Sequence, residues 1–206
     1  MATNIQIKKP FIVFDFWGTL AKLKTGPDFG IQICQLLGIP KKEYLRIVQE
    51  QWFVRQLSAN RFADVLIEVA TVSPVSRQEL ICWILNPISR AVLYPDAMGC
   101  LEGLSRRHKL FLVSDNSSNG IVIIEKLHIR HFFSDILLSC CSGVTKANGL
   151  YQKFFTGVPP EDAVVIGDSI TADLEPAKAC GAKVIHLNRN CDRQDDNSIN
   201  TLGALS

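Results

Sequence analysis

The sequence lacks the features that mark nucleic-acid binders, membrane proteins and disulfide-stabilised proteins. No run of Lys or Arg exceeds two residues and the formal net charge is +2, so a positive patch for nucleic acid or an anionic membrane is not expected. No stretch approaches the roughly 20 apolar residues that a membrane-spanning helix needs. The seven cysteines form no CxxC pair, which favours reduced thiols in a cytosolic protein.

The first ten residues also lack the apolar segment of a signal peptide. We therefore expect a cytoplasmic protein with no nucleic-acid and no membrane partner. Its 206 residues, 47% hydrophobic and 20% charged, suffice for one domain, or for one domain carrying a small insert. This composition favours a protein that acts on a small molecule, as a monomer or a homodimer.

Over most of the chain, strand-like runs alternate with helical patterns. Strands are predicted at 11–14, 109–113, 136–138, 163–166 and 183–187. Helices are predicted at 97–107, 120–127 and 172–180. Such alternation predicts right-handed crossovers and a mostly parallel sheet covered by helices on both faces. The fold class is therefore α/β, with a Rossmann-like three-layer core.

One segment near the N-terminus has a different texture. Residues 21–93 show helical periodicity with capping signals, such as Ser58 before Phe62 and Ser76 before Glu79. We predict two domains: a core built from residues 1–20 and 94–206, and a small all-helical domain formed by residues 21–93.

Four blocks of the sequence place polar groups at or near the ends of predicted strands. In a parallel sheet, ligands bind beyond the carboxyl ends of the strands, where such groups meet. These blocks are FDFWGTL from residue 14, LVSDN from residue 112, Lys146, and GDSITAD from residue 167.

In this order, the four blocks resemble the four motifs of the haloacid dehalogenase (HAD) superfamily of hydrolases. The resemblance covers nearly the whole chain apart from the helical segment, whose position after the first strand matches that family's helical cap. It implies a Mg²⁺-dependent phosphatase that hydrolyses a small phosphorylated metabolite through an aspartyl-phosphate intermediate.

The resemblance also implies roles for the acidic residues. Asp15 would be the nucleophile and a ligand of Mg²⁺, together with Asp168 and the backbone carbonyl of Trp17. Asp173 would bind the metal through water or orient its ligands. A cluster of like charges is easier to explain if a cation lies among them.

Further residues would bind the phosphoryl group. Lys146 would neutralise its charge and keep Asp15 ionised. Ser114, with backbone amides near Asp115 and Asn116, would hold the remaining phosphoryl oxygens. The Thr19 hydroxyl is expected to stabilise the turn after the first strand.

The sequence departs from the phosphatase pattern at Trp17. Phosphatases of this family usually carry Asp there, as general acid and then general base, and such help is worth roughly 10² to 10⁴-fold in rate. The enzyme would then favour good leaving groups, such as acyl or aryl phosphates, or another residue, with Asp115 the nearest candidate, would replace the acid.

Two other functions are open at this point. Haloacid dehalogenases of the same superfamily also carry an aromatic residue at this position, and their Asp attacks carbon without a metal. They lack the acidic metal pattern that Asp168 and Asp173 provide, which favours the phosphatase. The chain could also be a phosphate- or partner-binding domain that lost turnover with its general acid.

The helical segment offers candidate specificity residues. A turn over residues 56–61, with Arg55, Asn60 and Arg61, could read an anionic substrate group, although surface charges are the plainer interpretation. Trp52, Phe53 and Phe62 are expected in the core of the cap. The chain from Lys146 to Asp168 is short for the family, which predicts a trimmed helix over 149–155.

Overall fold

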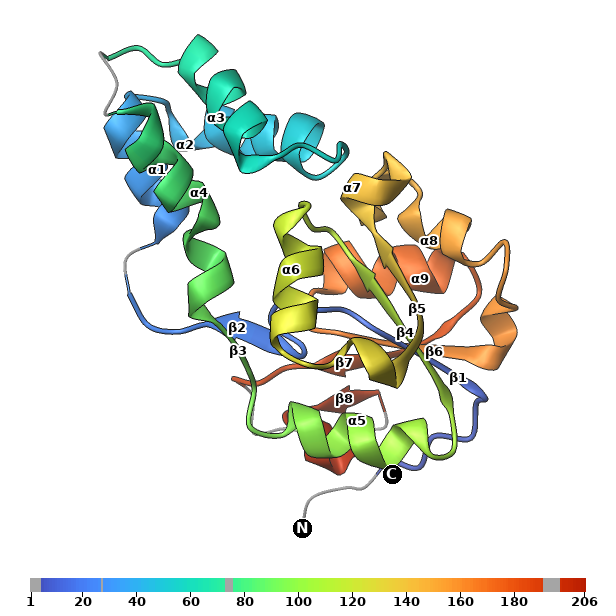
Figure 1. Ribbon diagram of the computed structural model, residues 1–206. Coiled ribbons are helices and arrows are strands. Elements are labelled where there is room, and N and C mark those ends of the chain that lie inside the picture. The colour runs from blue at the N-terminus through green and yellow to red at the C-terminus, as the bar shows by residue number, and fades with distance from the viewer. Residues whose placement is uncertain (1–4, 27, 73–75, 191–196) are drawn as a thin grey trace.

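The computed structural model describes residues 5–26, 28–72, 76–190 and 197–206, so Cys191 lies outside the described residues. Within them, six strands form one sheet in the order β5-β4-β1-β6-β7-β8, and all neighbouring strands are parallel (Figure 1). The strands are β1 (Phe11–Phe14), β4 (Lys109–Ser114), β5 (Phe133–Leu138), β6 (Ala163–Gly167), β7 (Lys183–Leu187) and β8 (Ser198–Ile199).

Helices cover both faces of this sheet, which makes the core a three-layer α/β unit. They are α5 (Ala97–Ser105), α6 (Asn119–Lys126), α7 (Ser139–Ser142), α8 (Leu150–Phe154) and α9 (Glu175–Ala179). Short helical turns link them: 3₁₀ turns at Arg130–Phe132, Lys146–Asn148, Pro160–Asp162 and Leu202–Ala204, and a π-helical segment at Ile170–Leu174.

The alternation of side chains along the strands explains the two layers of helices. Ile12 and Phe14 point to the face that packs against α5 and α6, whereas Val13 between them points to α8 and α9. All three side chains are fully buried. The predicted α/β class and three-layer core are confirmed, and the five predicted strands are present with ends that shift by at most three residues.

A group of helices between strands β2 (Ala21–Leu23) and β3 (Ala91–Leu93) forms its own hydrophobic cluster. They are α1 (Phe29–Leu37), α2 (Lys41–Ile47), a π-helical segment (Val48–Trp52), α3 (Ala59–Glu68) and α4 (Arg77–Arg90). Ser58 and Ser76 cap α3 and α4 as the sequence predicts, because their hydroxyls accept the backbone N–H groups of Arg61 and Glu79. We call residues 24–90 the helical insert; it lies to one side of the sheet in Figure 1.

The ends of this segment correct the expectation that residues 21–93 are all helical. β2 (Ala21–Leu23) and β3 (Ala91–Leu93) pair antiparallel, so the chain leaves and re-enters the core at one place. Each strand has three residues, too few for a period of two to be read from the sequence, and each needs the other to pair its backbone groups. In the part of the chain that the structure describes, no helix is both long and apolar enough to span a bilayer.

Candidate active site

The topology of the sheet places its candidate site next to β1. The chain runs from β1 to β4 and β5 on one side, then returns to β6 on the other side of β1. Ligands of open α/β sheets bind in the crevice that such a reversal leaves at the carboxyl ends of the strands. Asp15 follows β1 directly, Ser114 ends β4 and Asp168 follows β6, so the chain brings all three to this crevice.

Three carboxylates gather there. Oxygens of Asp15, Asp168 and Asp173 all lie within 4.8 Å of one another. Asp15 and Asp173 are buried, at 5% and 2% exposure, whereas Asp168 is exposed. Carboxylate oxygens at such spacing are the donors that Mg²⁺ prefers.

Two glycines make room for this group of carboxylates. A Cβ atom on Gly18 would lie 2.1 Å from Oδ2 of Asp168, and one on Gly167 would lie 2.6 Å from Asp173. Gly18 also has a φ of +79°, which favours glycine. The backbone therefore passes close against the carboxylates, and the residues present fit a Mg²⁺ ion.

Lys146, which is far from Asp15 in the sequence, also belongs to this cluster. Its ammonium group donates to Oδ1 of Asp15 and, at 2.5 Å, to Oδ1 of Asp173. The side chain is only 3% exposed, and the backbone N–H of Lys146 donates to Asp115 at 2.8 Å. Although α8 is as short as the sequence predicts, Lys146 still reaches the nucleophile position, because the turn at Lys146–Asn148 begins beside Asp115.

The pKa values of Asp15, Asp168 and Lys146 are all raised, for different physical reasons. Burial raises the pKa of Asp15 to about 7, against the ammonium of Lys146, which lowers it. Although Asp168 as a residue is exposed, the partial loss of water around its carboxyl group, and then the charge of Asp173, raise the pKa of Asp168. Burial alone would lower the pKa of Lys146, but the charge of Asp15, followed by further anionic neighbours, holds that pKa well above its usual range.

Two sequence expectations for the phosphate-binding groups are corrected by the hydrogen bonds. The backbone N–H of Asn116 already donates to the Ser139 hydroxyl at 2.9 Å, so it is not open to a phosphoryl oxygen. The Thr19 hydroxyl is buried and has no hydrogen-bond partner among the described residues, so it does not stabilise the turn. Backbone hydrogen bonds hold this turn instead: the N–H of Gly18 donates to the Ala21 carbonyl and the N–H of Leu20 to the Phe16 carbonyl, each at 2.9 Å.

Ser114 and Asp115 also lie at the carboxyl end of β4. Ser114 is buried, and its hydroxyl makes only a 3.5 Å contact with the Asp115 carbonyl. The Asp115 carboxylate accepts the Lys146 amide, and burial raises its pKa. Asp115 therefore positions the lysine, a role that the sequence did not indicate.

A family model described as haloacid dehalogenase-like hydrolase matches residues 11–181, which include all four motif blocks and the carboxylate cluster. The chain belongs to the haloacid dehalogenase-like hydrolases. Among curated proteins, no sequence matches it.

Solved structures agree with the fold of this HAD-like hydrolase. YfnB from Bacillus subtilis, described as a HAD hydrolase bound to magnesium, has a TM-score of 0.66, with 20% identity over 96% of each chain. A HAD family enzyme from Bacteroides thetaiotaomicron, in complex with magnesium and inorganic phosphate, has a TM-score of 0.68, with 16% identity over 89% of this chain and 96% of its own. A 2-haloacid dehalogenase from Pseudomonas syringae has a TM-score of 0.64, with 20% identity over 94% of this chain and 95% of its own. At these identities the likeness shows the fold.

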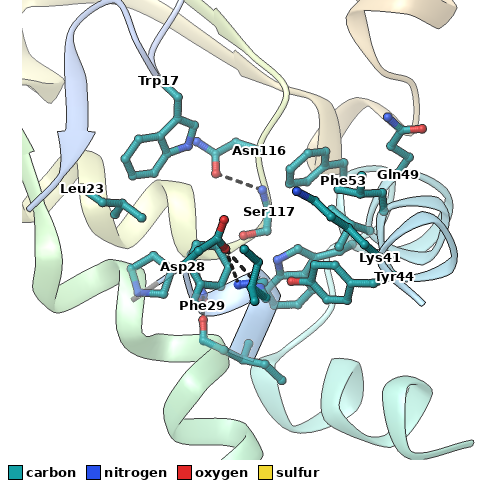
Figure 2. Close-up of a pocket in the computed structure, with 18 of the residues that line it drawn as sticks. Trp17, Leu23, Asp28, Phe29, Lys41, Tyr44, Gln49, Phe53, Asn116 and Ser117 are labelled. Carbon is teal, nitrogen blue, oxygen red and sulfur yellow. Dashed lines mark hydrogen bonds between the residues drawn. The ribbon is translucent and has the colours of Figure 1, made fainter. Parts of the chain in front are cut away.

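A pocket of about 370 Å³ lies between the core of this HAD-like hydrolase and its helical insert. Figure 2 shows Trp17, Asn116 and Ser117 of the core facing Tyr44 and Phe53 of the insert across it. Trp17 is two residues from Asp15 in the sequence, so the pocket reaches the loop after the nucleophile position, although none of the three carboxylates lines it.

The pocket changes the interpretation of the aromatic residues in the insert. Trp52 and Phe62 stack at 4.2 Å in its hydrophobic cluster, as expected, but Trp52 and Phe53 also line the pocket. Arg55, Asn60 and Arg61, the candidate anion readers, are exposed and do not line it.

Arg189 is a structural residue that the sequence did not indicate. It donates to the backbone carbonyls of Gly18 and Thr19 at 3.2 and 2.7 Å, and forms an ion pair with Asp96. Its guanidinium lies 3.7 Å from the ring centroid of Tyr94. It thus holds the loop after the nucleophile against the start of α5, and no local pattern in the sequence reveals a contact across 170 residues.

Proposed function

We propose that this HAD-like hydrolase is a Mg²⁺-dependent phosphatase that acts on a small phosphorylated metabolite through an aspartyl-phosphate. The observation that carries the proposal is the group of three carboxylates within 4.8 Å, two of them bonded to the ammonium of Lys146. Three carboxylates and one ammonium sum to a charge of −2 when all are ionised. A divalent cation neutralises that charge, and an oxygen-rich site of this kind suits Mg²⁺.

Each residue has a part in this proposal. Asp15 is the nucleophile, and the ammonium of Lys146 holds its carboxylate in place through a direct hydrogen bond. Asp15, Asp168 and the carbonyl of Trp17 would hold Mg²⁺, with Asp173 supporting them. When bound, Mg²⁺ reduces the repulsion between a carboxylate and an incoming phosphate and polarises the phosphoryl oxygens.

The phosphoryl group also needs donors from the protein. Ser114 has a buried hydroxyl at the tip of β4 with only a long contact to a carbonyl, which suits a phosphoryl oxygen. The magnesium and phosphate in the Bacteroides thetaiotaomicron enzyme support the same chemistry here.

The test is release of inorganic phosphate from phenyl phosphate, measured with Mg²⁺ and with excess EDTA. We expect activity with Mg²⁺ that chelation abolishes, and we expect Asp15→Asn to be inactive because an amide is a poor nucleophile. Asp162→Asn is the matched control, because Asp162 directly precedes β6 and so lies at the amino end of that strand, away from the site at its carboxyl end. Phosphate release that survives EDTA, or that survives Asp15→Asn, contradicts the proposal.

One observation favours a second function. Trp17 places an aromatic ring where the phosphatases carry their general acid, as the dehalogenases do, and the fold resembles that of a 2-haloacid dehalogenase. Chloride release from 2-chloropropionate in the presence of EDTA would support this function. The carboxylate cluster argues against it, because a metal-free reaction has no use for three neighbouring carboxylates.

A binding domain without turnover predicts a different result. It would bind Mg²⁺ and BeF₃⁻, a mimic of the phosphoryl group, yet release no phosphate from any phosphate ester. Isothermal titration beside the activity assay separates this case from the phosphatase.

A further inference from the structure

The pocket between the core and the insert has walls made mostly of carbon. Trp17 supplies one wall from the core. The insert supplies the others through aromatic rings on α1, on α2, and at and just after the end of the π-helical segment, namely Phe29, Tyr44, Trp52 and Phe53. Figure 2 shows Phe29, Tyr44 and Phe53 among them. A concave apolar pocket with few polar groups is the usual form of a site for an apolar ligand.

Two polar side chains of this pocket are already bonded within the protein. Asp28 accepts the backbone N–H groups of Gly30 and Ile31, at 2.8 and 3.2 Å. The side-chain amide of Asn119 donates to the Ile84 carbonyl at 2.9 Å. The exposed lining is mostly apolar, although Lys41 and Gln49 also contribute to it, so a ligand rich in hydroxyl groups, such as a sugar, would place many of them against carbon, which costs free energy.

One buried donor in the pocket has no partner among the described residues. It is the Nδ2 amide of Asn116, a residue only 4% exposed. Its Oδ1 accepts the backbone N–H of Ser117 at 3.0 Å, which fixes the orientation of the amide group. Asn116 is two residues beyond Ser114 at the tip of β4, so an oxygen of the ligand near the phosphorus can satisfy this donor.

The pocket has room for an aromatic ring. Its volume of about 370 Å³ lies within the range of roughly 300–1,000 Å³ that is usual for small-molecule sites. Stacked or edge-to-face contacts between aromatic rings each contribute about 0.5–1.5 kcal/mol of favourable free energy beyond the burial of apolar area.

The leaving group provides an independent constraint. With Trp17 in place of the proton donor, the departing oxygen leaves as an anion. The hydroxyl group of a phenol has a pKa near 10, whereas water has a pKa near 15.7. A phenolate therefore departs far more readily without a proton than an oxygen as basic as that of hydroxide. The aromatic walls and the missing acid therefore select the same kind of ligand.

We propose that the substrate is an aryl phosphate, a phosphate monoester of a phenol, whose ring fills the pocket between Trp17 and the aromatic residues of the insert. This proposal rests on the phosphatase function proposed above. Asp15 forms a bond to phosphorus as the bond from phosphorus to the phenolic oxygen breaks, and the electron pair leaves with that oxygen, which takes a proton from solvent. Water then hydrolyses the aspartyl-phosphate, which releases inorganic phosphate and restores Asp15.

The first experiment compares kcat/KM for 2-naphthyl phosphate, phenyl phosphate, glucose 6-phosphate and acetyl phosphate, all with Mg²⁺. We expect kcat/KM for the two aryl phosphates to exceed that for glucose 6-phosphate by roughly 100-fold. A preference for glucose 6-phosphate overturns the aryl assignment and leaves the phosphatase function standing. Release of phosphate from none of the four overturns the phosphatase function, and with it this proposal.

A second experiment tests the wall of the pocket through Phe53→Ala. We expect KM for 2-naphthyl phosphate to rise roughly tenfold, because a ring contact is lost. Acetyl phosphate carries no ring to place against this wall, so we expect its KM to rise less than the KM for 2-naphthyl phosphate. Leu85→Ala is the control, since Leu85 is 39% exposed on α4 and does not line the pocket. An unchanged KM for 2-naphthyl phosphate in Phe53→Ala contradicts the proposal.

A binding measurement on the wild-type protein tests the same proposal, and it requires neither turnover nor a variant that must fold. Two of the three tryptophans in the sequence, Trp17 and Trp52, line the pocket. We expect benzylphosphonate with Mg²⁺ to change the tryptophan emission at concentrations where methylphosphonate does not. Equal effects of the two phosphonates would mean that the ring does not enter the pocket.

Discussion

At the scale of single residues, the chemistry depends on a few side chains at the tips of β1, β4 and β6. Asp15 and Lys146 form a buried ion pair, and Asp173 shares the same ammonium. Trp17 takes the position of a proton donor and contributes its ring to the pocket. In the proposed function, these residues would combine the groups needed for phosphoryl transfer with an apolar pocket for the leaving group.

Trp17→Asp should restore the missing proton donor. We expect kcat/KM for alkyl phosphates to rise by roughly 10²-fold, because a general acid helps poor leaving groups most. The dependence of kcat on leaving-group pKa should become shallower, which a series of substituted phenyl phosphates measures. Trp17→Asn opens the same space without an acid and is the control. If the two variants show the same kcat/KM and the same dependence on leaving-group pKa, an acid at position 17 does not donate a proton to the leaving group.

Lys146→Met should destabilise the protein. Two buried carboxylates then lose their shared partner, and breaking a buried ion pair costs about 3–5 kcal/mol. We expect urea unfolding in EDTA to show this loss, and added Mg²⁺ to recover part of it by binding the folded state. Lys153→Met, an exposed lysine on α8, should change little. A Lys146→Met protein as stable as the wild type would contradict the role of this lysine.

At the scale of elements, segments far apart in the sequence hold the loop after the nucleophile. Arg189 follows β7, Asp96 precedes α5, and Thr201 lies before the last helical turn. The Thr201 hydroxyl donates to Asp96 at 2.7 Å, and the backbone N–H of Leu202 donates to the same carboxylate at 2.9 Å. The ends of three elements thus meet on one carboxylate behind the turn at Gly18.

Asp96→Asn should show how stability depends on pH. Although burial would raise the pKa of Asp96, hydrogen bonds from Arg189, Thr201 and Leu202 lower it below its usual range. A carboxyl group with a depressed pKa stabilises the folded state above its unfolded pKa, near 3.9, and loses this effect as the pH falls through the folded value. We expect Asp96→Asn to cost roughly 1.5–3 kcal/mol at pH 7.

The difference between wild type and Asp96→Asn should shrink when urea unfolding is repeated near pH 3. Glu102→Gln, on the exposed face of α5, serves as the control and should leave the pH dependence unchanged. A difference that stays constant between the two pH values would show that the Asp96 charge does not contribute.

At the scale of the whole molecule, the chain forms a sheet core and a helical insert joined by the β2–β3 pair. The insert buries its own cluster, which includes Ile33, Phe62 and Leu80, while the core clusters lie on the two faces of the sheet. The pocket lies where the two parts face each other. We propose that they are separate domains, with the insert as the cap. The monomer or homodimer and the cytoplasmic location stay predictions.

Excision of the insert tests this division. Residues 25–89 would be replaced by Asn-Gly, a turn that suits a two-residue hairpin, because the backbone N–H of Lys24 already donates to the Arg90 carbonyl. We expect a cooperative urea transition that retains the strand signal in circular dichroism, with hydrolysis of acetyl phosphate kept and the preference for aryl phosphates lost. A chain that does not fold would show that core and insert form one unit.

The local pattern of residues suffices to predict five of the six strands in the parallel sheet, all but β8, and three of the acidic positions. A buried strand needs a continuous apolar run, and a tight turn needs glycine, so Asp15 and Asp168 can be placed at strand tips from FDFWGTL and GDSITAD alone. The parallel order then brings them to one edge. Asp173 follows within the same block, five residues after Asp168.

Contacts between distant segments could be decided only by the tertiary structure. The hydrogen bond from Lys146 to Asp15 joins residues 131 positions apart, and the one from Arg189 to Gly18 joins residues 171 positions apart. The pocket needs Trp17 and Phe53 from two parts of the chain to face each other. Sequence periodicity reports which side of an element is buried, but not which element covers it. The candidate catalytic acids can therefore be recognised in the sequence, whereas the pocket proposed to bind the substrate cannot.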